Sequence, residues 1–188
     1  MNAIPKARYD TVSMLIHWVT AALLIFMIFF GEDLMATEEE GQEAGEALAG
    51  TFLPSLHVSI GVTILVLTLL RILWRISHPA PPLPPGMKPY AILALRAVHG
   101  LFYLLMIGLP LTGWLAFGEL LREEPAMAAV RVFGAIPLPA SPAWGEWTAE
   151  LHEIGSNVAM VLVGLHILAA LKHQFIDKDG LLGRMLPH

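Results

Sequence analysis

The chain has 188 residues, of which 56% are hydrophobic and only 14% charged, with no cysteine and a formal net charge of −5. Soluble domains carry roughly 25% charged residues, so this composition favours a membrane protein over an ordinary soluble enzyme. Without cysteine there are no disulfides, no Cys-ligated zinc and no Cys-held iron–sulfur clusters. No basic face is present to neutralise phosphates, which argues against nucleic acid as a partner.

Four apolar stretches are long enough to cross a bilayer, which takes about 20 residues in a helix. We expect these helices at about residues 11–31, 55–76, 90–117 and 147–175. Because they nearly exhaust the chain, the sequence predicts a single all-α domain over residues 1–188, an integral membrane four-helix bundle. Pro110 is expected to kink the third helix.

The connections between these helices differ in composition. Residues 32–54 are rich in Glu, Ala and Gly and are compatible with a short surface helix, whereas residues 78–89 are rich in proline and favour a stiff, extended link. Residues 118–146 mix Pro, Trp and charge, which favours partial order. Near the end of the second helix, Arg71 and Arg75 are expected to extend to lipid headgroups.

The distribution of Lys and Arg predicts the orientation in the membrane. Nine of these eleven residues lie at the N-terminus, the C-terminus or around the second connection, and only Arg122 and Arg131 lie on the opposite side. Both termini should therefore be cytoplasmic. The acidic first connection should face the other compartment, which is the periplasm in a Gram-negative bacterium.

Histidines mark two depths in the predicted bundle. His152 and His166 are 14 residues apart, so they lie about 21 Å apart along the fourth helix and within roughly 40° of each other around it. His173 falls on the same stripe. Since successive helices alternate in direction, His57 should lie at the depth of His152 in the outer half, and His17 at the depth of His166 in the cytoplasmic half.

Two histidines from facing helices at one depth suit a b-type haem with an imidazole on each side of the iron. A Cys-x-x-Cys-His sequence is absent, which excludes covalent haem attachment. Glycines near the histidines leave space for a flat macrocycle: Gly61, Gly155 and Gly164. The pattern therefore predicts two b haems whose iron is held by His17, His57, His152 and His166.

Other readings of these histidines carry less support. A single buried histidine is as often a hydrogen-bonded structural residue as a ligand, and it is the pairing by depth that favours ligands. A zinc or di-metal site, or a haem-free metal or proton transporter, would need carboxylates that the apolar spans lack. His78 and His188 are expected to be solvated, and Trp18 is a candidate wall for a porphyrin.

His99 has two open interpretations. It lies early in the third helix, on the same side as Arg96 and Tyr103. Together with His173 and Lys88 it would surround a polar headgroup such as a quinone carbonyl or a haem propionate. The alternative is a structural histidine with a backbone partner.

The sequence resembles the bacterial cytochrome b561 family of four-helix, two-haem membrane proteins over nearly its whole length. As a set, the following motifs carry the resemblance: R-Y-D and I-H-W within Arg8 to Trp18, L-H-V-S-I-G at Leu56 to Gly61, R-I-L-W-R and H-P-A-P-P within Arg71 to Pro82, H-G-L-F-Y-L-L-M-I-G-L-P at His99 to Pro110, W-T-A-E-L-H-E at Trp147 to Glu153, and G-L-H with A-A-L-K-H within Gly164 to His173. The family's haem ligands fall on His17, His57, His152 and His166.

The resemblance implies an electron-transfer protein of the bacterial inner membrane, similar to superoxide oxidases. In that reading the outer haem accepts electrons from periplasmic superoxide, and the inner haem passes them to ubiquinone near His173, Lys88 and His99. The outer side carries 13 acidic residues and two basic ones, which opposes capture of an anion unless Arg122 and Arg131 form a local positive mouth. The alternative is a relay subunit that exchanges electrons between the quinone pool and a basic periplasmic redox protein.

Overall fold

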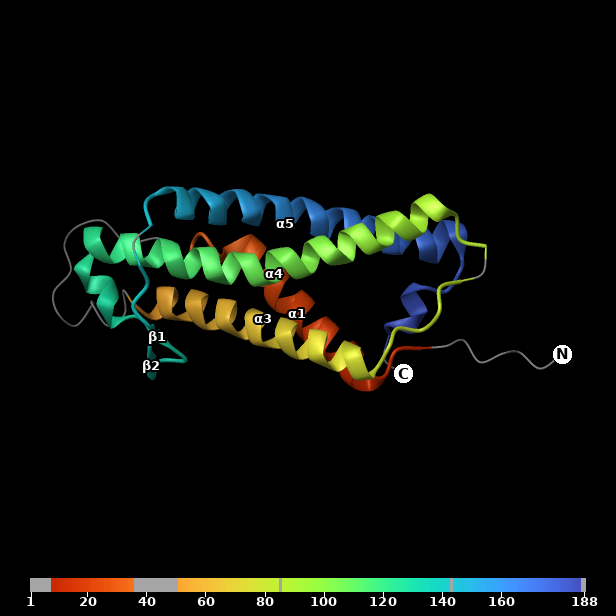
Figure 1. Cartoon of the computed structure of the whole chain (residues 1–188), viewed down its shortest axis with the longest axis horizontal. Coiled ribbons are helices and arrows are strands. Elements are labelled where there is room, and N and C mark those ends of the chain that lie inside the picture. Colours follow the sequence, from red (N-terminus) through yellow and green to blue (C-terminus); the bar gives the residue numbers. More distant parts are fainter. Residues whose placement is uncertain (1–7, 36–50, 85, 143, 187–188) are drawn as a thin grey trace.

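Four long helices form the body of the protein. The computed structural model describes residues 8–35, 51–84, 86–142 and 144–186. Its long helices are α1 (Thr11–Phe30), α3 (Phe52–Ser77), α4 (Pro89–Glu123) and α5 (Trp147–Lys172), which run along an elongated molecule (Figure 1). Even α1, with 20 residues, is long enough at about 1.5 Å per residue to cross the hydrocarbon core of a bilayer. All four are apolar enough to do so, which confirms the predicted all-α membrane bundle.

Some helix ends differ from the sequence-based prediction. Helix α3 begins at Phe52 rather than near residue 55, so His57 lies in its second turn. Helix α4 continues through Pro110 and beyond residue 117 to Glu123, because Phe117 is held in an apolar cluster with Met127 and Val130. The prediction of its end at residue 117 missed this tertiary contact.

The fourth predicted helix ends earlier as an α-helix than residue 175. Helix α5 stops at Lys172, and His173–Asp177 continue it as a single π-helical turn. The Lys172 ammonium contacts the Asp177 carboxylate at 2.5 Å. This pairing of residues five apart accompanies the wider turn.

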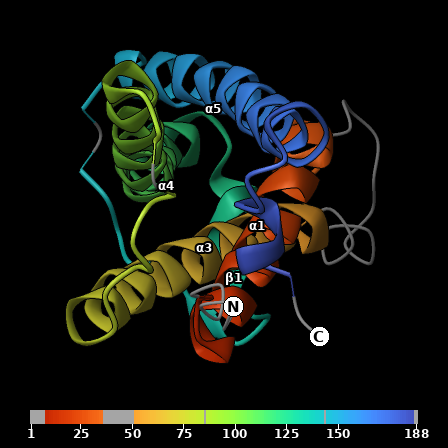
Figure 2. The same ribbon diagram turned by 90° about the vertical axis from the view of Figure 1, so that its right-hand side faces the viewer.

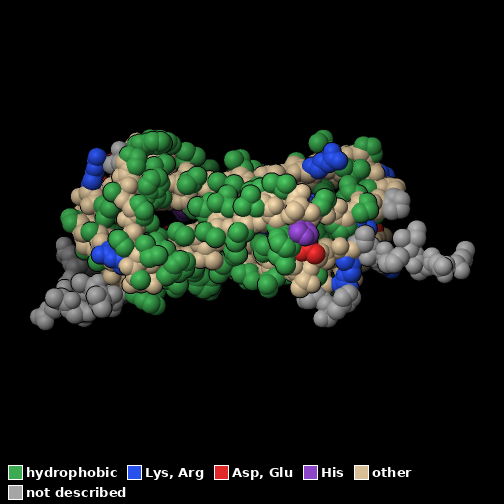
Figure 3. Space-filling model, turned by 60° about the horizontal axis from the view of Figure 1, so that its bottom comes forward, with side chains coloured by type: hydrophobic (Ala, Val, Ile, Leu, Met, Phe, Trp, Pro, Cys, Tyr) green, Lys and Arg blue, Asp and Glu red, His purple; other side chains and the backbone are tan. Residues whose placement is uncertain are grey.

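The helices pack as neighbouring pairs around an apolar core. Helix α4 lies against α5, α1 against α3, and α3 against α4 (Figure 2). The buried residues at the centre come from α1, α3 and α4: Leu24, Ile60, Ile64 and Met106. Large apolar side chains also cover the outside along the length of the bundle, while Lys and Arg gather toward its ends (Figure 3). This is the surface that a membrane-spanning bundle requires.

A small folded cap closes one end of the bundle. It comprises a 3₁₀ turn (Pro125–Ala129) and an antiparallel pair of strands, β1 (Arg131–Val132) and β2 (Ile136–Pro137). The backbone N–H of Arg131 donates to the Ser55 hydroxyl at 3.1 Å, and that of Phe133 donates to the Ser59 hydroxyl at 2.8 Å. The cap is therefore fixed to α3 on either side of His57.

The other end of the bundle gathers both chain ends and the proline-rich connection (Figures 1 and 2). The Tyr9 N–H donates to the Arg184 carbonyl, and the Arg184 guanidinium donates to the Pro82 carbonyl at 2.5 Å. The Trp18 indole N–H donates to the Met185 carbonyl at 2.6 Å. The surface helix expected in the first connection falls mostly outside the described residues, as does His188.

Candidate functional site: two pairs of histidines in the bundle

The first histidine pair lies near the capped end. His57 on α3 and His152 on α5 face each other with their ring centres 6.1 Å apart and their planes inclined by 53°. Both side chains are partly buried. The structure therefore brings together the two residues that were paired by depth in the sequence.

Backbone carbonyls fix the orientation of both rings. Nδ1 of His57 lies 2.9 Å from the Gly31 carbonyl at the end of α1, and Nδ1 of His152 lies 2.9 Å from the Leu109 carbonyl of α4. A carbonyl only accepts, so each Nδ1 carries the proton and each Nε2 keeps a free lone pair. This is the arrangement in which histidines ligate metals through Nε2.

A glycine on α4 makes room for the His152 ring. A Cβ added at Gly113 would lie 3.0 Å from the ring carbon Cε1 and 3.1 Å from Nδ1. The Thr112 hydroxyl beside it lies 3.3 Å from the same Nδ1. Helix α4 therefore positions His152 from two consecutive residues, neither of which the sequence analysis selected.

The second pair lies toward the end that gathers the termini. His17 on α1 and His166 on α5 have ring centres 6.3 Å apart, with the planes inclined by 68°. The Phe102 ring packs edge-on against His166 at 5.3 Å. Trp18, proposed from the sequence as a porphyrin wall, contacts His17 edge-on at 5.2 Å and directs its indole N–H at the C-terminal segment.

His99 belongs to the surroundings of this second pair. Its Nδ1 lies 2.7 Å from the Leu95 carbonyl, and its ring packs edge-on against His166 at 5.7 Å. The backbone partner favours the structural interpretation of His99. Its contact with His166 places it beside the second histidine pair.

Arg71 does not extend to the lipid headgroups as expected. Its guanidinium Nη1 lies 3.0 Å from Nδ1 of His17, and Tyr103 of α4 interacts with the same side chain. Arg71 therefore lies between three helices inside the bundle. The prediction failed because an arginine near a helix end has the same sequence signature whether it points outward or inward.

The spacing of both pairs fits a metal held between two imidazoles. Two metal–nitrogen bonds of about 2 Å, each extended by about 1 Å to the ring centre, give about 6 Å. A Cβ added at Gly61 or Gly164 would meet nothing within 4 Å, and an apolar groove of about 280 Å³ lies between α1 and α5 at Gly164. Gly155 instead serves helix packing, since a Cβ there would meet Leu109 at 2.8 Å.

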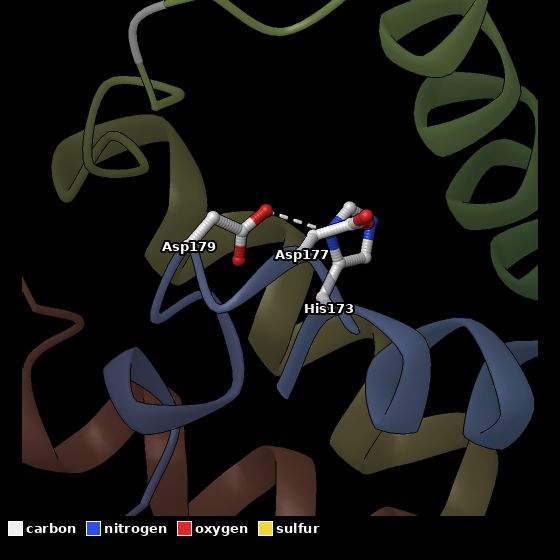
Figure 4. Close-up of side chains that lie close together, drawn as sticks. All are labelled: His173, Asp177 and Asp179. Atoms are coloured by element: carbon white, nitrogen blue, oxygen red, sulfur yellow. Dashed lines mark hydrogen bonds and ion pairs between the residues drawn. The ribbon is translucent and has the colours of Figure 1, made fainter. Parts of the chain in front are cut away.

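His173 lies in a separate cluster after α5. Its Nδ1 is 2.6 Å from a carboxylate oxygen of Asp179 and 3.3 Å from one of Asp177 (Figure 4). Potential ligand atoms of the three residues lie within 4.8 Å of one another, but Asp177 already pairs with Lys172. Lys88 is exposed, with its ammonium 5.8 Å from the centre of the Tyr90 ring. His173, Lys88 and His99 thus contact different neighbours among the described residues.

Together, four helices able to cross a membrane and two facing imidazole pairs define a helical membrane protein with two candidate cofactor sites. A family model described as prokaryotic cytochrome b561 matches residues 8–188. The chain therefore belongs to the prokaryotic cytochrome b561 family. It is an electron-transfer protein of the bacterial inner membrane, and membership implies b-type haem.

Three relatives align over almost the whole chain. Cytochrome b561 homolog 2 of Escherichia coli (strain K12) is 32% identical over 95% of this chain and 91% of its own length. Cytochrome b562 of Cereibacter sphaeroides is 31% identical over 95% and 94%, respectively. A protein named probable superoxide oxidase CybB in Yersinia pestis is 28% identical over 96% of both chains.

Proposed function

We propose that this protein is a di-haem b cytochrome that transfers electrons from superoxide on the periplasmic side to ubiquinone. The balanced reaction is two superoxide anions, one ubiquinone and two protons giving two dioxygen molecules and one ubiquinol. The observation that carries the proposal is the presence of two imidazole pairs at two depths, His57 with His152 and His17 with His166. The name of the Yersinia pestis relative supports the choice of substrate.

In this proposal the four histidines hold the two haems, one at each depth. A bound haem supplies a one-electron redox centre. The outer pair is already in the tautomer that leaves both Nε2 atoms free, because the Gly31 and Leu109 carbonyls accept from Nδ1. With 14 residues between His152 and His166, the two pairs are about 21 Å apart along α5, a separation that bridges most of the bilayer core.

We place both termini in the cytoplasm, in accordance with the excess of Lys and Arg at that end. The capped end then faces the periplasm. There, the guanidinium of Arg131 donates to the carbonyls of Ala128 and Val130, whereas Arg122 pairs with Glu119 at 3.5 Å. Arg131 has no carboxylate within salt-bridge distance among the described residues, which leaves its charge available to attract an anion.

We place ubiquinone at the opposite end, near His173. Asp179 accepts from Nδ1 of His173, which leaves Nε2 able to hydrogen-bond a quinone carbonyl and to relay a proton. A hollow of about 460 Å³ adjoins this residue at Gln174 and has Lys178 and Arg184 in its wall. Lys88 and His99 remain the other candidates for this role.

The second candidate function is a relay subunit that exchanges electrons between the quinone pool and a basic periplasmic redox protein. The acidic balance of the predicted outer side, 13 acidic residues against two basic ones, favours it. Such a partner would dock by charge complementarity, and superoxide alone would then not reduce the protein.

The test is to mix the detergent-purified protein with superoxide and then with a short-chain ubiquinone, after measuring haem per chain as the pyridine haemochrome. Two b haems that superoxide reduces rapidly and quinone reoxidises would support the oxidase. Two haems that respond only to a reduced or oxidised basic cytochrome would select the relay. A preparation that binds a single haem per chain would contradict both.

A further inference from the structure

We propose that Arg71 is the cationic partner of a propionate carboxylate on the haem held between His17 and His166. This inference rests on the proposed inner haem site and adds a residue that anchors the edge of the cofactor. It begins from a positive charge inside a membrane bundle. Charged groups at such positions pair with an opposite charge or serve a functional pathway.

Within the described residues, Arg71 has no carboxylate at salt-bridge distance. The ion pairs in this part of the chain join Arg122 with Glu119, Lys172 with Asp177, and His173 with both Asp177 and Asp179. Its neighbours are the imidazole of His17 and the side chains of Tyr9 and Tyr103, together with a second cation, Arg75. The nearest groups therefore do not neutralise the guanidinium.

The contact between Arg71 and His17 fixes the tautomer of the His17 ring. A guanidinium only donates, so Nδ1 of His17 accepts at 3.0 Å and the proton of a neutral imidazole must be on Nε2. Ligation of iron through Nε2 requires the opposite tautomer, the one that the outer pair already has. When His17 ligates iron, the Arg71 guanidinium can no longer donate to Nδ1 of His17, so the guanidinium needs another acceptor nearby.

A haem propionate has the required chemistry and place. It is an anion with two oxygens, which a guanidinium can bind in a bidentate manner. Arg71 lies six residues before the end of α3 at Ser77, and His17 lies six residues after the start of α1 at Thr11, so both are about 9 Å from the same end of the bundle. A macrocycle between His17 and His166 with its propionates toward that end would bring a carboxylate to Arg71.

The test compares Arg71→Gln and Arg71→Lys with Arg75→Gln. Arg75 lies one turn further along α3, is exposed, and has its guanidinium 5.5 Å from the Tyr9 ring centre, so it is a matched change of charge without the interior position. The measurements are haem per chain, the rate of haem transfer to apomyoglobin, and the resonance Raman propionate bending band. The midpoint potential of each haem is measured as well.

We expect Arg71→Gln to release the inner haem at least about tenfold faster than the wild type, because loss of one member of a buried charge pair acts mainly on dissociation. The propionate band and the potential of the remaining inner haem should also shift, the potential downward, since removal of a nearby positive charge favours the oxidised, more positive state. Arg71→Lys should be intermediate in haem release, and Arg75→Gln should match the wild type.

The proposal is overturned if Arg71→Gln matches Arg75→Gln in haem release, Raman band and potential. Should Arg71→Gln fail to fold, an Arg71→Lys variant indistinguishable from the wild type in Raman band and haem release would overturn it equally. Failure of the proposed inner site gives a different result, namely that His17→Ala retains two haems.

Discussion

His57 and His152 face each other across the bundle with ring centres 6.1 Å apart. Each ring is held by a backbone carbonyl from another helix: His57 by Gly31 at the end of α1, and His152 by Leu109 of α4. All four helices thus take part in positioning one imidazole pair. The second pair, His17 and His166, lacks such carbonyl partners for its Nδ1 atoms among the described contacts. The two sites should therefore respond differently to mutation.

Removal of one outer histidine should remove one haem. In His57→Ala or His152→Ala, the haem content should fall from two per chain to one, because a low-spin b haem needs both axial imidazoles. The pyridine haemochrome assay and the optical spectrum measure this directly. The converse changes, His17→Ala and His166→Ala, should spare the outer haem. Loss of both haems from any single change would contradict the pairing.

A methyl group at Gly113 should disturb only the outer site. In Gly113→Ala the new Cβ would lie 3.0 Å from Cε1 of His152, which forces the ring or α4 to move by a few tenths of an ångström. We expect a changed electron paramagnetic resonance signal and faster release of the outer haem, with the inner haem unchanged. Gly108→Ala is the matched control, because Gly108 lies on the same helix and a Cβ there would meet nothing within 4 Å. Equal spectra for the two variants would show that Gly113 has no positioning role.

The quinone end can be tested without loss of haem. In His173→Ala, reoxidation of the reduced protein by ubiquinone should slow at least about tenfold, because a positioned proton donor is lost. Asp179→Asn should slow the reoxidation less, because the His173 imidazole remains and only the carboxylate that orients it is lost. Lys88→Gln and His99→Gln test the other two candidates. If His173→Ala kept the wild-type rate while Lys88→Gln or His99→Gln was slow, the slow variant would identify the quinone-binding residue instead.

Asp10 should make the membrane domain sensitive to acid. It caps α1 by accepting from the Ser13 N–H at 2.9 Å and the Trp74 indole N–H at 3.0 Å. Partial burial acts to raise the pKa of Asp10, but these hydrogen bonds prevail and lower it from 3.8 to about 2. The folded state therefore binds its proton less readily than the unfolded state. The stabilisation is present above about pH 4 and is lost as the pH falls toward 2.

Thermal unfolding in detergent, followed by circular dichroism, measures this contribution. Asp10→Ala should lower stability at neutral pH by about 1 kcal/mol, as expected for loss of an N-cap, and Asp10→Asn by less. Neither variant should show the wild-type loss of stability from this carboxylate between pH 4 and 2. Asp33→Asn, an exposed carboxylate just after α1, should leave the profile unchanged. A wild-type profile in Asp10→Asn would refute the role of the charge.

The fold and the histidine pairs could be predicted because both depend on simple periodic rules. Apolar length identifies the spans, and the alternation of helix direction assigns a depth to each histidine. Arg71 could not be placed in this way, since its position six residues from the end of α3 is compatible with either lipid or interior. Gly113 was missed because its role depends on the packing of α4 against α5, which brings the His152 ring to the Leu109 carbonyl and against Gly113. Likewise, the extension of α4 to Glu123 depends on the folded cap, which no local pattern specifies.

Arg131 should control capture of superoxide if the oxidase proposal holds. The Arg131 guanidinium donates to the neutral carbonyls of Ala128 and Val130, which do not offset its charge. The charge of Arg122, in contrast, is offset by the Glu119 carboxylate at 3.5 Å. In Arg131→Gln the second-order rate of haem reduction by superoxide should fall several-fold at low ionic strength, and its dependence on salt should weaken. Arg122→Gln should have the smaller effect.

Stopped-flow absorbance at a series of salt concentrations distinguishes the Arg131→Gln variant from the Arg122→Gln variant. If both variants kept the wild-type rate and salt slope, superoxide would not be guided by these arginines, and the acidic surface would favour docking of a basic redox protein instead.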